Sequence, residues 1–445
     1  MKDRTFYKKL FRLTLPATIQ ALMLSLVAVS DALMLGSIDQ NIMSAVTLAT
    51  QVQFIQNMIL SAGTGAAAIL GAQYYGKQDE KALTRILHIA LKFGAVVSVV
   101  SFILCEFCPG LLMDIFTNIP ALKEIGISYL KISAFSYLLT GFSQAYLTIM
   151  KVSGHTKITA IVSSAAVVCN IVLNAVLIFG LAGLPAMGVT GAALATAITR
   201  VIELIVCLIF SYRKQYIRLD IRLFFKYEGP LFRDFLKVML PLLGAGLFWG
   251  LGFTSYTAFM GHLGTDASAA NSVASVVRDM VCCITDGMAI GSGILIGNEL
   301  GAGRLDTGRQ YGDQLVVIAF LIGGISTLIM LSVTPLVRHL VTLTTDAGTI
   351  LNGMMLVLSL YMIGRAVNTI IINGIFSAGG DTLYDLYSLA VCMWCLAVPL
   401  AAAGTFLFHW SPVVVYACTC LDEVGKIPWT LLHYKRHLWV RDLTR

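Results

Sequence analysis

Apolar stretches of about twenty residues recur along the whole length of this chain, and each is long enough to cross the hydrocarbon core of a bilayer as a helix. Soluble chains carry charge on about a quarter of their residues. Of the 445 residues here, only 12% are charged and 57% are hydrophobic. The apolar runs are continuous and do not alternate with polar positions, which favours helices over a β-barrel. The sequence therefore predicts an all-α polytopic membrane protein.

Breaks that carry charged residues, Gly or Pro divide the apolar sequence into twelve predicted transmembrane helices. They cover residues 13–36, 43–72, 86–107, 122–150, 157–180, 187–212, 235–262, 269–297, 310–335, 349–376, 383–408 and 411–433. Twelve spans place both termini on one side, and the loops of that side hold most of the Lys and Arg residues. The opposite loops hold only Lys123 and Arg338. The positive-inside rule therefore predicts that both termini are cytoplasmic.

Short motifs recur at a spacing of 225 to 227 residues, which indicates an internal duplication. The pairs are Leu15-Pro16 with Leu240-Pro241, 71–77 with 297–304, and 153–156 with 379–382. Each repeat holds six helices, an even number, so the halves share one orientation and are related by an axis along the membrane normal. The predicted organisation is an N-terminal six-helix lobe (1–212), a cytoplasmic linker (213–234) and a C-terminal six-helix lobe (235–445).

One motif resembles a nucleotide site without being convincing. Gly71, Gly76 and Lys77 fit most of a phosphate-binding loop, but Gln78 stands where such a loop has Ser or Thr, and no strand precedes it. An ion gradient is therefore the expected energy source. The seven histidines are dispersed, so neither an enzyme nor a metal site is predicted.

The order and spacing of several motifs resemble the multidrug and toxic compound extrusion (MATE) family over the whole chain, and within it the bacterial DinF-like branch. The motifs are Leu15-Pro16, Asp31 and Gly36 in the first helix, Asn170 with the LIFG run at 177–180, the run at 188–193, and the GNELGAG turn at 297–303. The resemblance implies a V-shaped fold of two six-helix bundles. It also implies export of cationic or amphipathic drugs in exchange for inward flow of protons or sodium.

Asp31 is the main candidate for cation coupling. A carboxylate inside an apolar run costs at least about 2.5 kcal/mol on insertion scales, so it should face the bundle interior. The matching aspartate is the coupling group in the resembled family. Asn170 and Asn174, one turn apart on a helix, complete the predicted site, although glue between helices is the alternative role for them. Many MATE proteins have an aspartate where Asn174 stands, and the missing charge favours a proton over sodium.

The second lobe has charges at different places from the resembled family. Some members carry an essential glutamate in the seventh helix, where this chain has no acid. The charged residues here are Arg278, Asp279, Asp286 and Arg365. We expect them to neutralise one another, with Asp286 beside Arg365, and a role in gating or substrate binding is the alternative. Arg200 and Glu203, three residues apart, are expected to form a local ion pair.

Aromatic and methionine side chains could shape a promiscuous substrate cavity, because such side chains repack around varied apolar cations. The candidates are Tyr137, Trp249, Tyr256, Met260 and Tyr361, with Met362 beside the last. Ordinary core packing is the alternative for each of them. Pro16 and Pro241 are the expected points of helix bending.

The sequence thus predicts a monomeric secondary active multidrug efflux antiporter of the bacterial cytoplasmic (inner) membrane. Its expected partners are small organic cations or amphipathic drugs and the lipid bilayer, with the proton favoured over sodium and no cofactor. The basic residues are scattered through short loops, so no nucleic acid is expected. The alternative is a lipid-linked oligosaccharide flippase of the related superfamily, which would have extra helices and a strongly cationic cavity.

Overall fold

The computed structural model describes residues 4–181, 183–213, 217–219, 228–341 and 343–444. All regular elements within these residues are helical, and none of them is a strand. Half of the predicted linker at 213–234, namely 214–216 and 220–227, lies outside the described residues, and 229–234 belong to the helix α9.

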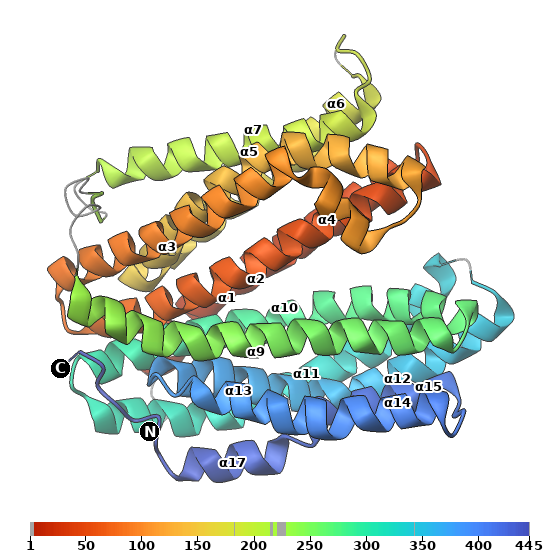
Figure 1. Ribbon diagram of the computed structural model, residues 1–445. Helices are drawn as coiled ribbons and strands as arrows, with labels where there is room; N and C mark the ends of the chain where they lie inside the picture. The colour runs from red at the N-terminus through yellow and green to blue at the C-terminus, as the bar shows by residue number, and fades with distance from the viewer. Residues whose placement is uncertain (1–3, 182, 214–216, 220–227, 342, 445) are drawn as a thin grey trace. The chain divides into compact units, whose positions relative to one another are not determined.

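The helices of the first half follow the six predicted spans, and most begin or end a few residues beyond them (Figure 1). They are α1 (Arg4–Gly36), α2 (Gln40–Gly76), α3 (Glu80–Phe107), α5 (Pro120–Met150), α6 (Thr156–Phe179) and α7 (Gly188–Ser211). Two further elements were not predicted, a short helix α4 (Pro109–Phe116) and the irregular segment η1 (Lys151–His155) between α5 and α6.

The second half begins regularly and becomes irregular toward its end. The regular helices are α9 (Gly229–His262), α10 (Thr265–Gly301), α11 (Leu305–Leu340) and α12 (Thr345–Asn368). The irregular part consists of η2 (Thr369–Phe376), α13 (Leu383–Leu389), η3 (Ala390–Ala397), α14 (Val398–Phe406), α15 (Pro412–Thr419), α16 (Leu421–Val424) and α17 (Ile427–Lys435). The segments η2 and η3 are π-helical, and the last predicted span is broken into three short helices.

Ten helical stretches of the described chain are long and apolar enough to cross a membrane. One of them, Pro120–Phe179, comprises α5, η1 and α6. Its backbone leaves helical geometry at Ser153 and Gly154, so it provides two of the predicted spans. The broken stretch α15–α17 corresponds to the twelfth. The predicted all-α membrane fold is confirmed.

The duplicated turns share an unusual backbone conformation. Gln78 and Gly303, which lie 225 residues apart, have φ values of 61° and 74°. Gly154 and Gly380, 226 residues apart, have φ values of 86° and 75°. Positive φ is uncommon outside glycine, so its recurrence at matching positions supports the internal duplication.

Gly303 gives a test of this backbone requirement. A Cβ atom at Gly303 would meet nothing within 4 Å, and the same holds for Gly324 inside α11. Gly303→Ala is expected to destabilise the protein by about 1 kcal/mol because alanine is strained at positive φ. Gly324→Ala is expected to stabilise it by up to about 1 kcal/mol through helix propensity. Thermal unfolding in detergent should therefore shift in opposite directions, and equal shifts would contradict the argument.

Contacts group the chain into two compact units. Unit 1 consists of Met1–Ala21, Ala72–Gln78 and Leu240–Arg445, and unit 2 consists of Leu22–Gly71 and Asp79–Met239. Three continuous helices, α1, α2 and α9, therefore contribute residues to both units. In α9 the boundary between the two units falls beside Pro241. In α1 the boundary follows Pro16 by about one and a half turns. The predicted lobe boundaries and the bending at both prolines stay predictions.

Unit 2 is built on helix pairs, because α3 packs on α5, α5 on α7 and α6 on α7. Its apolar core includes Leu130, Ala134 and Tyr137, all fully buried. The side-chain amide of Gln56 donates a hydrogen bond through Nε2 to the backbone oxygen of Tyr137 at 2.9 Å. This bond fixes α2 against α5 within the unit.

Unit 1 is organised around α10, which packs against α11, α12 and η2. The chain after α17 belongs to its core, since Trp439 is 0% exposed and stacks on Tyr434 at 5.6 Å between ring centroids. Gln73 at the end of α2 accepts from the backbone N–H of Leu443 at 2.7 Å and donates to the oxygen of Ala378 at 2.7 Å. These contacts anchor the C-terminal residues to the end of α2.

Candidate functional site

The predicted coupling residue Asp31 lies in the part of α1 that belongs to unit 2. The Nδ2 atom of Asn174 on α6 donates to its Oδ1 at 2.6 Å. Asn174 is only 1% exposed, whereas Asp31 is partly exposed. A buried amide donor that contacts a carboxylate stabilises its charged form.

A chain of hydrogen bonds continues from Asp31 to α7. Nδ2 of Asn174 also donates to Oδ1 of Asn170 at 3.3 Å, and Nδ2 of Asn170 donates to the hydroxyl of Thr196 at 3.4 Å. Thr196 in turn donates to the backbone oxygen of Ala192 at 3.1 Å. The structure therefore brings Asp31, Asn170 and Asn174 together, as the sequence predicted.

The site contains one carboxylate and two amide side chains. The carboxylate of Asp31 accepts a hydrogen bond from the Asn174 amide, and Oδ1 of Asn174 is buried without a hydrogen-bond partner in the described structure. Within the described residues, no group of three His, Cys, Asp or Glu side chains could hold a metal ion. The predicted role of the three residues in coupling stays a prediction.

The predicted local ion pair of α7 is confirmed. Nη1 of Arg200 lies 2.7 Å from Oε2 of Glu203. The hydroxyl of Ser143 on α5 donates to the same oxygen at 3.2 Å. The Ser143 hydrogen bond links α5 to α7 within unit 2.

The four predicted charges of the second half form two ion pairs in unit 1. Nη2 of Arg365 lies 3.6 Å from Oδ1 of Asp286, which confirms the predicted pairing. Arg278 contacts Asp279, its neighbour in sequence, at 2.9 Å, and its guanidinium lies 4.8 Å from the ring centroid of Phe253. Their predicted role in gating or substrate binding stays a prediction.

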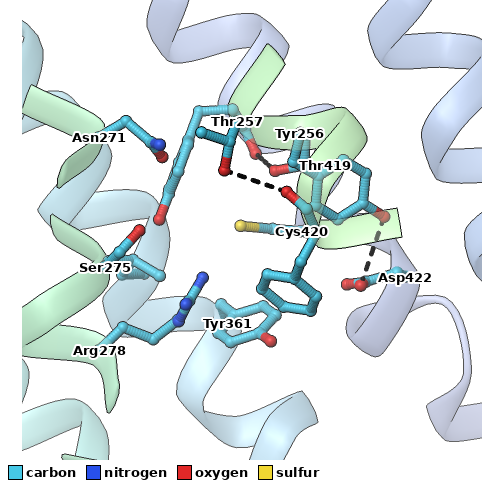
Figure 2. Close-up of a pocket in the computed structure, with 12 residues that line it drawn as sticks. Tyr256, Thr257, Asn271, Ser275, Arg278, Tyr361, Thr419, Cys420 and Asp422 are labelled. Atoms are coloured by element: carbon cyan, nitrogen blue, oxygen red, sulfur yellow. Dashed lines mark hydrogen bonds between the residues drawn. The ribbon is translucent and has the colours of Figure 1, made fainter. Parts of the chain in front are cut away.

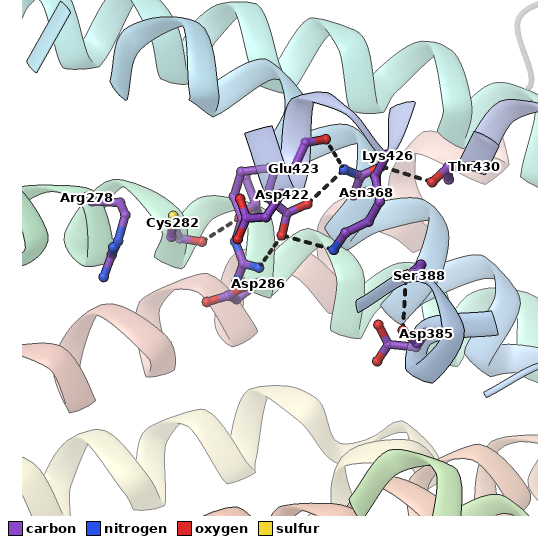
Figure 3. A network of polar contacts seen from close by, with 12 residues as sticks. Arg278, Cys282, Asp286, Asn368, Asp385, Ser388, Asp422, Glu423, Lys426 and Thr430 are labelled. Carbon is purple, nitrogen blue, oxygen red and sulfur yellow. Dashed lines mark hydrogen bonds and ion pairs between the residues drawn. The ribbon is translucent and has the colours of Figure 1, made fainter. Parts of the chain in front are cut away.

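A buried network that the sequence analysis missed surrounds Glu423 (Figure 3), and Arg365 takes part in it. Its Nη1 lies 3.4 Å from Oε1 of Glu423, and Nζ of Lys426 lies 3.7 Å from the same oxygen. Nδ2 of Asn368 donates to Oε2 of Glu423 and to its backbone oxygen, both at 2.7 Å. Glu423 and Lys426 are 4% and 2% exposed.

The break in the last span positions this network. The short helix α16 carries Glu423, and a Cβ atom at Gly364 on α12 would lie 3.1 Å from the Glu423 backbone. That close approach lets Asn368 reach both the backbone and the side chain of Glu423. A sequence signal was present, because Asp422, Glu423 and Lys426 lie inside the apolar span predicted at 411–433, where charged groups mark functional sites.

The predicted cavity residues occupy different places. Tyr256 and Tyr361 line one cavity in unit 1. Met260 and Tyr137 are 1% exposed and belong to hydrophobic clusters, while Trp249 packs against the cluster that contains Tyr256. The structure therefore brings Tyr256 and Tyr361 to one cavity and places Met260 and Tyr137 in the core. Their role in substrate binding stays a prediction.

A family model and curated relatives match most of this chain. The MatE family model matches residues 16–176 and 241–403. The uncharacterized transporter YisQ of Bacillus subtilis is 26% identical over 403 residues, which cover 90% of this chain and 87% of YisQ. The probable multidrug resistance protein NorM of Thermotoga maritima is 22% identical over 437 residues, or 97% of this chain and 93% of NorM.

Solved structures show the same fold at low sequence identity. A MOP superfamily transporter of Pyrococcus furiosus has a TM-score of 0.87 at 18% identity, covering 97% of this chain and 95% of its own. The MATE transporter VcmN of Vibrio cholerae also has a TM-score of 0.87, at 16% identity, covering 98% and 97%.

Proposed function

Because the chain belongs to the MatE family of membrane transporters, we propose that it is a secondary active antiporter. It exports small organic cations or amphipathic drugs in exchange for protons. The observation that carries the proposal is the contact of Asp31 with the buried amide of Asn174 at 2.6 Å. This is a carboxylate inside a membrane-spanning helix, a position at which charge is expensive and functional.

The proton is preferred over sodium because of the groups around Asp31. The neighbouring amide presents its N–H group to the carboxylate, and Oδ1 of Asn170 is already occupied by Asn174. The oxygen atoms left for a metal ion among these three side chains are those of the Asp31 carboxylate and the unpartnered Oδ1 of Asn174, fewer than the roughly six that a hard cation takes. A proton needs a single oxygen, and desolvation in the membrane favours its binding to the carboxylate.

The substrate class follows from charge and from relatives. A carboxylate at Asp31 attracts a cation, and proton uptake by Asp31 would remove that attraction. Among the relatives, those called NorM carry the name probable multidrug resistance protein. The chain would act as a monomer in the cytoplasmic membrane of a bacterium, with both termini in the cytoplasm, as the distribution of Lys and Arg predicts.

Exchange would follow from competition for Asp31. When Asp31 is charged, it holds the organic cation and the Asn174 amide together. When a proton arrives from the outer side, the carboxylate becomes neutral and the cation is released outward. Bending of α1 at Pro16 would then close the emptied pocket.

Everted membrane vesicles test the proposal with ethidium as the cationic dye. An acidic interior should drive dye uptake into vesicles that contain the protein, and adding ammonium chloride should collapse it. Vesicles from cells with an empty vector are the control. A sodium gradient without a pH gradient should drive none. Uptake equal to the empty vector would reject drug export, and uptake driven by sodium alone would reject the proton.

A further inference from the structure

A small polar cavity lies inside unit 1 (Figure 2), and none of the residues that line it belongs to the proposed Asp31 site. Its volume is about 30 Å³, which is enough for a water molecule, since a water needs about 10–15 Å³ by this measure. Hydroxyl, amide and charged groups line it, among them Thr257, Asn271, Ser275, Arg278, Tyr416 and Asp422. A site of this size and polarity can hold a water molecule.

Asp422 is the carboxylate of this cavity, and it is poorly compensated. Asp422 is 2% exposed to solvent. Oδ2 accepts a long hydrogen bond of 3.4 Å from the hydroxyl of Tyr256, and Oδ1 is buried without a hydrogen-bond partner in the described structure. Asp422 forms no ion pair with a described Lys or Arg. A buried carboxylate in that state is costly when ionised.

The charges around Asp422 do not balance. Besides Asp422, three carboxylates belong to the network, namely Glu423, Asp286 and Asp385. Among the described residues, the cations of the network are Arg365 and Lys426. Arg278 also lines the cavity, and its guanidinium pairs with the carboxylate of Asp279, its neighbour in sequence. With all four carboxylates ionised, the network would carry excess negative charge in a low-dielectric environment.

Four carboxylates against two cations leave two negative charges without a counter-charge, and burial decides which carboxylate would take a proton. Glu423 has two cations and an amide as partners. Asp286 has Arg365, and its side chain is 43% exposed. Asp385 is partly exposed, so water can solvate its charge. Only Asp422 combines full burial with no cation of its own.

We propose that Asp422 binds a proton, supplied through the water-sized cavity, and that it is a second protonation site of this transporter. The tyrosines 256, 361 and 416 and the thiol of Cys420 surround the same cavity. They donate hydrogen bonds or stay neutral, so they do not supply the missing charge. The proposal deepens the proposed function, on which its role in transport rests, but proton binding at Asp422 can be measured without transport.

A proton fits Asp422 better than a metal cation. Arg365 and Lys426 lie within electrostatic reach of Asp422 and would repel a cation that has to sit beside them. The described residues also contain no group of three carboxylate, imidazole or thiol side chains suited to a metal. A proton adds to the carboxylate oxygen without requiring further ligands.

The backbone around Asp422 supports a functional role for this segment of the chain. Asp422 and Glu423 lie on α16, a helix of four residues between two breaks, and α16 packs against the π-helical segment η3. Discontinuous helices inside membranes occur where they line a site, and π-helical turns are frequent at functional sites. In the first half, the corresponding helix α7 is regular, so the break is specific to the second half.

A change in the protonation of Asp422 would alter the ion pairs next to it. When Asp422 loses its proton, its charge competes with Glu423 for Lys426 and Arg365. Arg365 also holds Asp286 on α10. The proton state of α16 is therefore linked to the contacts that α12 makes with α10.

Infrared spectroscopy of the full chain in lipid nanodiscs tests the proposal. A buried protonated carboxyl group gives a C=O stretch at higher frequency than a hydrated one. In a pH titration of wild type, we expect a titrating band of this kind. Asp422→Asn should lose it, whereas Asp346→Asn, which changes an exposed carboxylate, should keep it. Asp31→Asn should keep the Asp422 band too.

A second variant keeps the test decisive if Asp422→Asn fails to fold. Tyr256→Phe removes the hydroxyl that contacts Asp422 and should shift the same band without removing it. A spectrum of Asp422→Asn identical to wild type would overturn the proposal, as would a Tyr256→Phe band at the wild-type frequency. If wild type shows the Asp422 band but no dye export, the proposed function fails while proton binding at Asp422 stands.

Discussion

Replacing Asp31 with asparagine is expected to reduce proton-driven dye export to the level of vesicles without the protein. Asparagine keeps the size of the side chain and can still hydrogen-bond Asn174, which contacts Asp31 at 2.6 Å. It cannot take up a proton or carry the charge that attracts an organic cation. Uptake of ethidium under an acid-inside gradient measures the loss, with equal amounts of folded protein verified by size-exclusion chromatography.

Two other variants separate loss of the carboxylate from general damage. Asn174→Ala removes the amide but leaves the carboxylate, so it should retain a measurable part of the export rate. Asp114→Asn removes an exposed carboxylate that pairs with Lys123 at 2.5 Å and should export at the wild-type rate. Wild-type export by Asp31→Asn would refute the mechanism, and the coupling would then have to be sought among the charges of unit 1.

Replacing Glu423 with alanine is expected to destabilise the protein by about 3–5 kcal/mol, as is usual when one partner of a buried ion pair is removed. Glu423 is 4% exposed and holds Arg365, Lys426 and Asn368. Without it, the Lys426 side chain, which is 3% exposed, would be a buried cation that has lost its partner. Thermal unfolding in detergent measures the effect.

The matched control is an ion pair at the surface. Asp234 and Lys237 are 2.8 Å apart, with side chains 45% and 62% exposed. Because exposed pairs contribute about 0–1 kcal/mol, Asp234→Ala should change the unfolding temperature only slightly. Equal shifts for Glu423→Ala and Asp234→Ala would show that the buried network does not stabilise unit 1.

The spans and the duplication could be predicted because they depend on local composition. A helix that crosses a membrane must satisfy its backbone within itself, so a run of apolar residues determines both its structure and its environment. The turns at Gly154 and Gly380 repeat for the same reason, since glycine tolerates positive φ wherever it stands. Asp31 was identifiable because one carboxylate in an apolar run is conspicuous in the sequence itself.

The sequence by itself determined that this protein is an all-helical membrane protein with two related halves, and that Asp31, Asn170 and Asn174 are its first candidate site. The tertiary structure alone decided the second network. Glu423 lies 58 residues from Arg365 and 55 from Asn368, and the break that exposes its backbone to Asn368 depends on the packing of α16 against α12. No local sequence pattern predicts these ion-pair partners, because charge pairing inside a membrane depends on which helices pack together and at which depth their charged residues lie.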